Sequence, residues 1–245
     1  NDRKSGGNRL KMAAVVISRY VYCREHHKKT EDTMNLKTAK AVTGHKSGLG
    51  KPSKMPGYST SLPAKDCKVG AKLAQISGSV CESCYAMKGH YMFPDVRAGL
   101  QRRLDALTDP QWVEGMTKLV GHYTDPSNPY FRIHDSGDFQ SVEHILNWVA
   151  VARGLSWVHI WGPSREIAMI KIARGLSAIT GDWPPNLVIR LSAPMVGKAL
   201  NIAGPTSSVD VDGGNQCPAP TQGNECVDCR ACWNPEVSNV NYHKH

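Results

Sequence analysis

The sequence predicts an α/β protein built on a parallel sheet, and three observations carry this prediction. Short apolar runs at residues 130–134, 157–161 and 187–191 have the length and composition of strands. Longer segments with apolar residues at helical spacing lie between them, and strands alternating with helices form parallel βαβ units. A polar cluster follows each run, where the sites of such folds lie. We therefore expect a partial or complete (β/α) barrel-like sheet, followed by a cysteine-rich C-terminal tail.

The elements follow one another along the chain. Residues 35–66 are rich in Gly, Lys, Ser and Pro and predict a loop with one short strand at 58–62. One helix is expected from Pro94 to Leu107, and a second is expected to be capped by Asp109. Ser141 has the position of an N-cap for a helix that ends at Gly154, and Ser164 is expected to open a helix to about residue 180.

The charge divides the chain unevenly. Residues 1–54 hold 13 Lys and Arg against 4 Asp and Glu, and the remainder is neutral. We expect a basic leader at 1–54, a barrel-like domain at 55–199 and a metal-binding tail at 200–245. The leader is able to bind nucleic acid through phosphates. A solvated leader, or one that is untranslated before Met34, explains the charge equally well.

Compartment is indicated by what the sequence lacks. No run reaches the roughly 18 apolar residues of a membrane span, and there is no secretory signal. We therefore expect no membrane partner and a reducing cytoplasmic location. Cysteines at CxxC spacing in that compartment are typical of metal ligands rather than disulfides.

The first cysteine group is the stretch CKVGAKLAQISGSVCESCYA, which contains Cys67, Cys81 and Cys84. Thiols at such spacing indicate a metal or iron–sulfur centre. A set of small buried side chains, or one disulfide with a thiol left over, is the alternative.

The second cysteine group lies in CPAPTQGNECVDCRACW, a segment poor in apolar residues. Its spacing resembles four-iron cluster ligation more than a zinc ribbon. Zinc is the alternative, favoured especially if His243 or His245 replaces one cysteine as ligand. A bound metal would supply the order that burial cannot. The predicted ligands are Cys217, Cys226, Cys229 and Cys232.

Three cysteines with no evident fourth would leave one iron of a four-iron cluster open. This is the arrangement that binds S-adenosylmethionine. The CxxCYA sequence resembles the cluster loop of radical S-adenosylmethionine proteins, including phage-associated ones. The usual C-x3-C-x2-C pattern differs from this chain, which has x13 and places Tyr85 after the last cysteine.

A wider resemblance covers most of residues 54–245. It rests on LPA, CxSCYAxKGxY, HDSGDFxSxEH, GPSRE and the cysteine-rich tail. Together these motifs resemble the phage "gene product 88" family, which implies the cytoplasm of an infected or prophage-carrying cell. The strand ends supply Asp135, Asp138 and Arg165 as candidate catalytic residues. They supply Gly137, Asp138 and Ser192 as candidate cofactor-binding residues.

A second resemblance suggests another reaction. The segment DSGDFQ, beginning at Asp135, is similar to DSGGFQ of tRNA-guanine transglycosylases, which have a barrel beside a cysteine-rich zinc site. Asp135 would then be the catalytic carboxylate in deazaguanine insertion. A third possibility is a non-catalytic, metal-stapled nucleic-acid-binding protein.

Overall fold

The fold is organised around one seven-stranded sheet, in a computed structural model that describes residues 34–181 and 183–244. Its strand order is β1-β2-β3-β4-β5-β7-β6, and every paired neighbour is parallel. The strands are β1 (Tyr58–Ser59), β2 (Tyr130–Arg132), β3 (His159–Ser164), β4 (Leu187–Ser192), β5 (Thr206–Val209), β6 (Asn215–Gln216) and β7 (Asn239–Tyr242).

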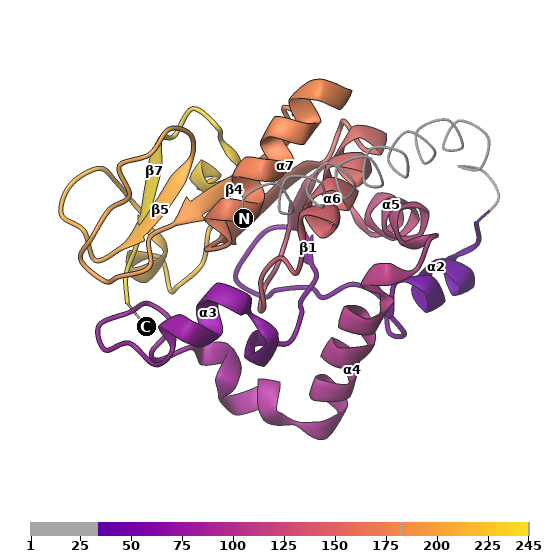
Figure 1. The fold of residues 1–245 in the computed structure, drawn as a ribbon, viewed down its shortest axis with the longest axis horizontal. Coiled ribbons are helices and arrows are strands. Elements are labelled where there is room, and N and C mark those ends of the chain that lie inside the picture. Colours follow the sequence, from indigo (N-terminus) through magenta and orange to yellow (C-terminus); the bar gives the residue numbers. More distant parts are fainter. Residues whose placement is uncertain (1–33, 182, 245) are drawn as a thin grey trace, which may run out of the picture.

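Helices cover one face of the sheet and enclose the main core (Figure 1). The α-helices are α2 (Leu36–Val42), α3 (Lys68–Leu73), α4 (Pro94–Asp105), α5 (Trp112–Tyr123), α6 (Val142–Gly154) and α7 (Ile167–Thr180). Side chains from α5, α6 and α7 pack against Phe131, Ile160 and Ile189. Because side chains alternate along a strand, these residues define the helix-covered face.

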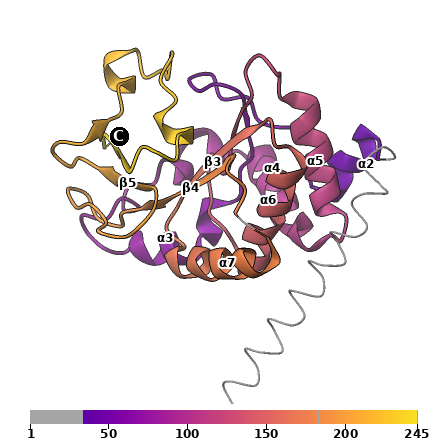
Figure 2. The same ribbon diagram turned by 90° about the horizontal axis from the view of Figure 1, so that it is seen from above.

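The opposite face carries a second, smaller core. Trp161 of β3 and Val188 of β4 pack there against Trp233, with Tyr130 and Tyr242 at its margin. Figure 2 shows α7 on one side of β3 and β4 and the C-terminal segment on the other. The cysteine-rich segment therefore lies over the face of the sheet that α5, α6 and α7 leave uncovered.

The predicted α/β class and parallel sheet are confirmed, and the sheet is open. Successive strands are neighbours from β1 to β5, as in a barrel, but β1 and β6 at the two ends do not pair. The complete barrel is therefore wrong. A separate cysteine-rich tail is not confirmed either, because β5, β6 and β7 of segment 200–245 belong to the main sheet.

Several predicted boundaries shift. The loop predicted for 35–66 contains α2, whose Asn35 side chain caps the helix by accepting from Thr38 N. The Ser141 cap is confirmed. Asp109 instead accepts from Gln111 N before α5 begins at Trp112. Ser164 ends β3 and does not open the next helix, which starts at Ile167.

The predicted basic leader lies mostly outside the described residues, as does Cys23. Its last part is described: α2 packs its buried Ala39 into the main core beside α5, and Met34 is buried as well. No helix in the described ranges is long and apolar enough to cross a bilayer.

Candidate functional site

Loops from four strands meet at the carboxyl edge of the sheet. After β1 and β2, Leu62 N donates to Ser136 O (2.8 Å) and Asp135 N donates to Thr60 O (2.7 Å). The first cysteine loop is fixed to the chain after β4, where Val80 N donates to Pro194 O at 2.9 Å. The three cysteines of this loop are thus held where parallel sheets place their sites.

Two of these thiols flank Gly70. A Cβ at this glycine would lie 3.6 Å from the Sγ atoms of both Cys67 and Cys81, so the two sulfurs are separated by no more than twice that distance. Cys67 stands directly before α3, and Glu166 holds this helix by accepting from Val69 N at 2.8 Å. The end of β3 therefore fixes the position of Cys67.

The electrostatic surroundings oppose free thiolates. Burial, followed by the nearby Asp138, Cys84, Cys81 and Glu166, raises the pKa of Cys67 to about 12. Burial also raises the pKa of Cys81, although the Arg165 guanidinium acts in the opposite direction. A cationic metal centre is what would favour deprotonation of such thiols.

Asp138 is a buried carboxylate that joins the ends of β2 and β3. It accepts from Ser164 Oγ (2.6 Å), Phe139 N (2.7 Å) and Arg165 N (2.9 Å). Burial raises its pKa to about 6, and these three hydrogen bonds act in the opposite direction. Gly137 before it has φ +82°, and a Cβ there would lie 2.7 Å from Leu62 O. Close packing thus explains this glycine.

Asp135 anchors the loop that follows Cys84. Its carboxylate pairs with Arg132 Nη1 at 2.7 Å and accepts from Tyr91 Oη at 2.8 Å. The Tyr85 hydroxyl donates to the Asp135 carbonyl. Both carboxylate oxygens are therefore engaged, and the role predicted for Asp135 in base exchange stays a prediction.

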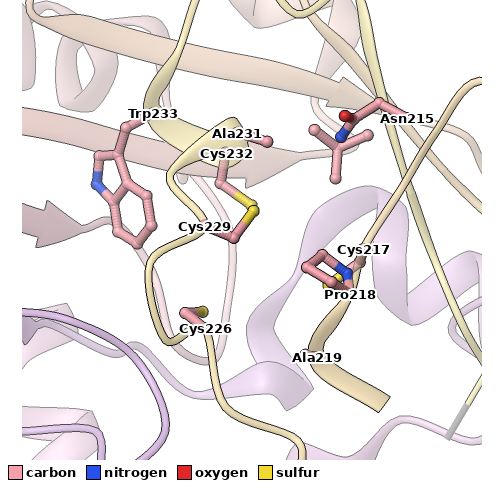
Figure 3. A pocket seen from close by; sticks show the side chains of 10 residues that line it. Asn215, Cys217, Pro218, Ala219, Cys226, Cys229, Ala231, Cys232 and Trp233 are labelled. Carbon is pink, nitrogen blue, oxygen red and sulfur yellow. The ribbon is translucent and has the colours of Figure 1, made fainter. Parts of the chain in front are cut away.

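The second cysteine group lines a hollow next to the second core. Figure 3 shows Cys226, Cys229 and Cys232 on the loop before Trp233, with Cys217 facing them from the segment after β6. The hollow holds about 20 Å³, the size of roughly one water-sized sphere. Burial raises the pKa of Cys232 to about 12, against the Tyr242 hydroxyl and the charge of Arg190.

Arg190 of β4 fixes the loop of the second cysteine group to the sheet. Its side chain is fully buried, and its guanidinium donates to five backbone carbonyls. Four lie at residues 231–237 and one on β5, at 2.7 to 3.2 Å: Ala231, Cys232, Asn234, Val237 and Thr206. All five donors of the side chain are satisfied.

The sequence profile of the gene product 88 family matches residues 23–235, which include both cysteine groups and all four strand ends. The chain belongs to this family. No curated protein and no solved structure matches it. The phage family setting is thus shown, whereas the resemblance to radical S-adenosylmethionine proteins has no support from these comparisons.

Within the described part of this gene product 88 protein, no three or more His, Cys, Asp or Glu side chains are arranged to hold one metal ion. A single-ion site at either cysteine group is therefore not confirmed. The thiolates of a four-iron cluster each bind a separate iron, so they do not have to converge on one point. The nearness of Cys67 and Cys81 is compatible with that spacing.

The gene product 88 fold gathers most of the predicted site residues. Asp138 and Cys81 are close enough to Cys67 to raise the pKa of its thiol. Arg165 is close enough to Cys81 to act on the pKa of that thiol. Ser192 is not seen to join them, because its hydroxyl bonds to Ser207 Oγ at 2.9 Å.

Four residues that fix the site are not among the candidates predicted from the sequence: Tyr91, Arg132, Glu166 and Arg190. Tyr91 and Glu166 lie in the CxSCYAxKGxY and GPSRE motifs, so membership of these motifs could have identified them. Arg190 offered a different signal, since it is a charged residue inside an apolar strand. Such a residue needs buried partners.

Proposed function

We propose that this gene product 88 protein is an iron–sulfur protein similar to radical S-adenosylmethionine enzymes and that it modifies nucleic-acid bases in the host cytoplasm. The observation that carries the proposal is the position of the first cysteine group. Its thiols lie at the carboxyl edge of an open parallel sheet, with Asp138 and Arg165 beside them. The other four described cysteines lie apart, in the second cysteine group.

Cys67, Cys81 and Cys84 would hold a four-iron cluster. Bound by three thiolates, such a cluster supplies one open iron for the amino acid part of S-adenosylmethionine. Arg165 supports a ligand site here, because its Nε is buried without a hydrogen-bond partner among the described residues. Glu166 and Asp138 act as positioning residues, since they tie Val69 and Ser164 to the same edge.

The second cysteine group would hold its own centre, as a cluster or as zinc. Its position over the second core, fixed by Arg190, supports a structural role. Removal of this centre is therefore expected to affect stability before it affects chemistry at the first group.

Anaerobic purification with iron, sulfide and zinc analysis tests the proposal. We expect about four irons and four sulfides for each cluster, with charge-transfer absorption near ~400 nm. Cys84→Ala should remove the contribution of the first group only, and Cys229→Ala that of the second only. With a one-electron reductant and S-adenosylmethionine, the parent protein should yield 5′-deoxyadenosine and Cys84→Ala should not. Stoichiometric zinc without sulfide would overturn the proposal.

The same preparation distinguishes the iron–sulfur proposal from the transglycosylase hypothesis. That hypothesis requires guanine exchange that is lost in Asp135→Ala, with zinc as the bound metal. Guanine exchange that persists in Asp135→Ala would remove this aspartate from the role.

A further inference from the structure

A basic hollow lies between α2 and the end of α4. It measures about 520 Å³ and is lined by Lys37, Lys40, Lys46 and Arg102 over apolar residues of α2. None of the residues lining it is acidic, and residues 34–54 contain five lysines and no Asp or Glu. Within the described ranges, none of these four cations forms an ion pair. Such a surface attracts phosphate groups.

Close packing between the turn after α2 and the end of α4 fixes the shape of the hollow. At the turn after α2, Gly44 has φ +71°, and a Cβ there would lie 2.4 Å from the carbonyl oxygen of Arg102. The two helices therefore meet at a contact that no larger residue permits.

An apolar segment is exposed at the other end of α4. Between Cys84 and the first turn of this helix, five large apolar side chains face solvent: Tyr85, Met87, Met92, Phe93 and Val96. Phe93 is 54% exposed and packs edge-on against His90, with ring centroids 5.0 Å apart. Lys88 and Arg97 are also exposed here, against a single acid, Asp95. Figure 1 shows this segment projecting between α3 and α4.

Helix α4 joins the two features. It spans 12 residues, from the turn after Phe93 to the turn beyond Arg102, which is a length of roughly 18 Å. An exposed aromatic segment at one end and a cationic hollow at the other are the two parts of a surface that binds single strands.

We propose that α4 carries a binding track for single-stranded nucleic acid, with phosphates in the basic hollow and a base stacked on Phe93 beside the first cysteine group. The proposal deepens the proposed function by naming its substrate class. A single strand fits because its base faces are free to stack, whereas in a duplex they are covered by neighbouring pairs. A purely apolar partner would leave the four cations of the hollow without an anionic partner.

Fluorescence anisotropy with the full chain tests the track, with labelled single-stranded DNA and RNA of one sequence and a hairpin duplex as probes. The double variant Lys40→Ala/Lys46→Ala should weaken single-strand binding about tenfold. It should also reduce the salt slope by roughly 1.4, the value for two phosphate contacts. The matched control is Lys171→Ala, at an exposed position on α7, and it should change neither quantity.

Base stacking needs a measurement of its own, because lysines anywhere on the chain can bind phosphate and affinity alone does not detect a stacked base. A probe containing 2-aminopurine should lose fluorescence on binding. Phe93→Ala should abolish this quenching and weaken binding about tenfold, with the salt slope unchanged. Ile179, an exposed apolar residue on α7, provides the control Ile179→Ala. Tighter binding of DNA or of RNA assigns the natural strand.

Three results would overturn the track. One is unchanged affinity and salt slope in the double lysine variant. Another is unchanged quenching and affinity in Phe93→Ala. A third is a dimer, seen by light scattering, that Phe93→Ala dissociates without affecting nucleic-acid affinity, because the segment would then be a protein interface. Iron and sulfide content is measured on every variant. If the binding track is disproved while the iron and sulfide content is unchanged, the proposed function still stands.

Discussion

Tyr91 donates a hydrogen bond to the carboxylate of Asp135, 44 residues later, with Oη and Oδ2 2.8 Å apart. Tyr85, next to Cys84, donates to the backbone carbonyl of the same aspartate. The CxSCYAxKGxY and HDSGDF motifs are therefore parts of one contact, in which the end of β2 holds the loop that carries Cys84.

The first prediction concerns this contact. Tyr91→Phe should lower the free energy of unfolding by about 1 kcal/mol, the usual net value of one hydrogen bond. It should also speed tryptic cleavage after Lys88, because the loop loses an anchor. Urea denaturation and timed proteolysis measure the two effects. Tyr123→Phe on α5 is the control, and equal cleavage rates in both variants would contradict the anchoring role.

The second prediction compares two helical glycines. Gly70→Ala places a Cβ 3.0 Å from Cys67 Cβ and 3.6 Å from two sulfurs, whereas a Cβ at Gly175 of α7 meets nothing within 4 Å. Alanine stabilises an exposed helix by about 1 kcal/mol relative to glycine. Gly175→Ala should therefore gain this stability, and Gly70→Ala should not gain it and should lower iron content. An equal gain in both would show that the space beside the thiols is not restricted.

The third prediction concerns Arg190 and its five carbonyl partners. Arg190→Met should lower the free energy of unfolding by about 3 kcal/mol or more, because several buried carbonyls lose their donors together. Arg190→Lys should recover only part of the loss, since an ammonium has three donors. Arg174→Met is the comparison, because Arg174 donates to the Ile189 carbonyl at 3.3 Å. Similar losses at both positions would remove the special role of Arg190.

The fourth prediction is a loss of stability in mild acid. Burial, with the charge of Arg103 second, lowers the pKa of His45 to about 3, from 6.5 in the unfolded chain. Below pH 6.5 the unfolded state therefore binds a proton that the folded state does not, and stability falls as the pH falls. At pH 5 this histidine alone should cost about 2 kcal/mol relative to neutral pH.

His45→Gln tests this prediction by removing the titrating group. The difference in unfolding free energy between pH 7 and pH 5 should shrink by about 2 kcal/mol. An unaltered pH dependence in His45→Gln would mean that this ring has the same pKa in the folded and unfolded states.

The pattern of apolar residues predicted the sheet class and most helices, because burial at periods of two and 3.6 residues is a local property of the chain. It missed α2, whose seven residues are too few for a sustained period. It also placed the end of β3 three residues early, since Gly162 and Pro163 resemble a turn but pair with Ile189 and Arg190 of β4.

The sequence predicted which residues belong to the site better than it predicted how they contact one another. Cysteine spacing and strand ends named Cys67, Asp138 and Arg165, because those signals are local. The contacts of Glu166 with Val69 and of Tyr91 with Asp135 join residues far apart in sequence. No spacing rule encodes such contacts, and the open sheet likewise depends on β1 and β6, which lie at its opposite edges.

The buried guanidinium of β4 also bears on the order in which this chain can fold. Four of its five partners lie at residues 231–237, which a ribosome makes some forty residues after Arg190 itself. Until that segment emerges, the guanidinium at the centre of the sheet lacks four of its five partners, so the nascent sheet should stay loosely formed. Its consolidation would then be a late event, shared by the strands and the cysteine loop.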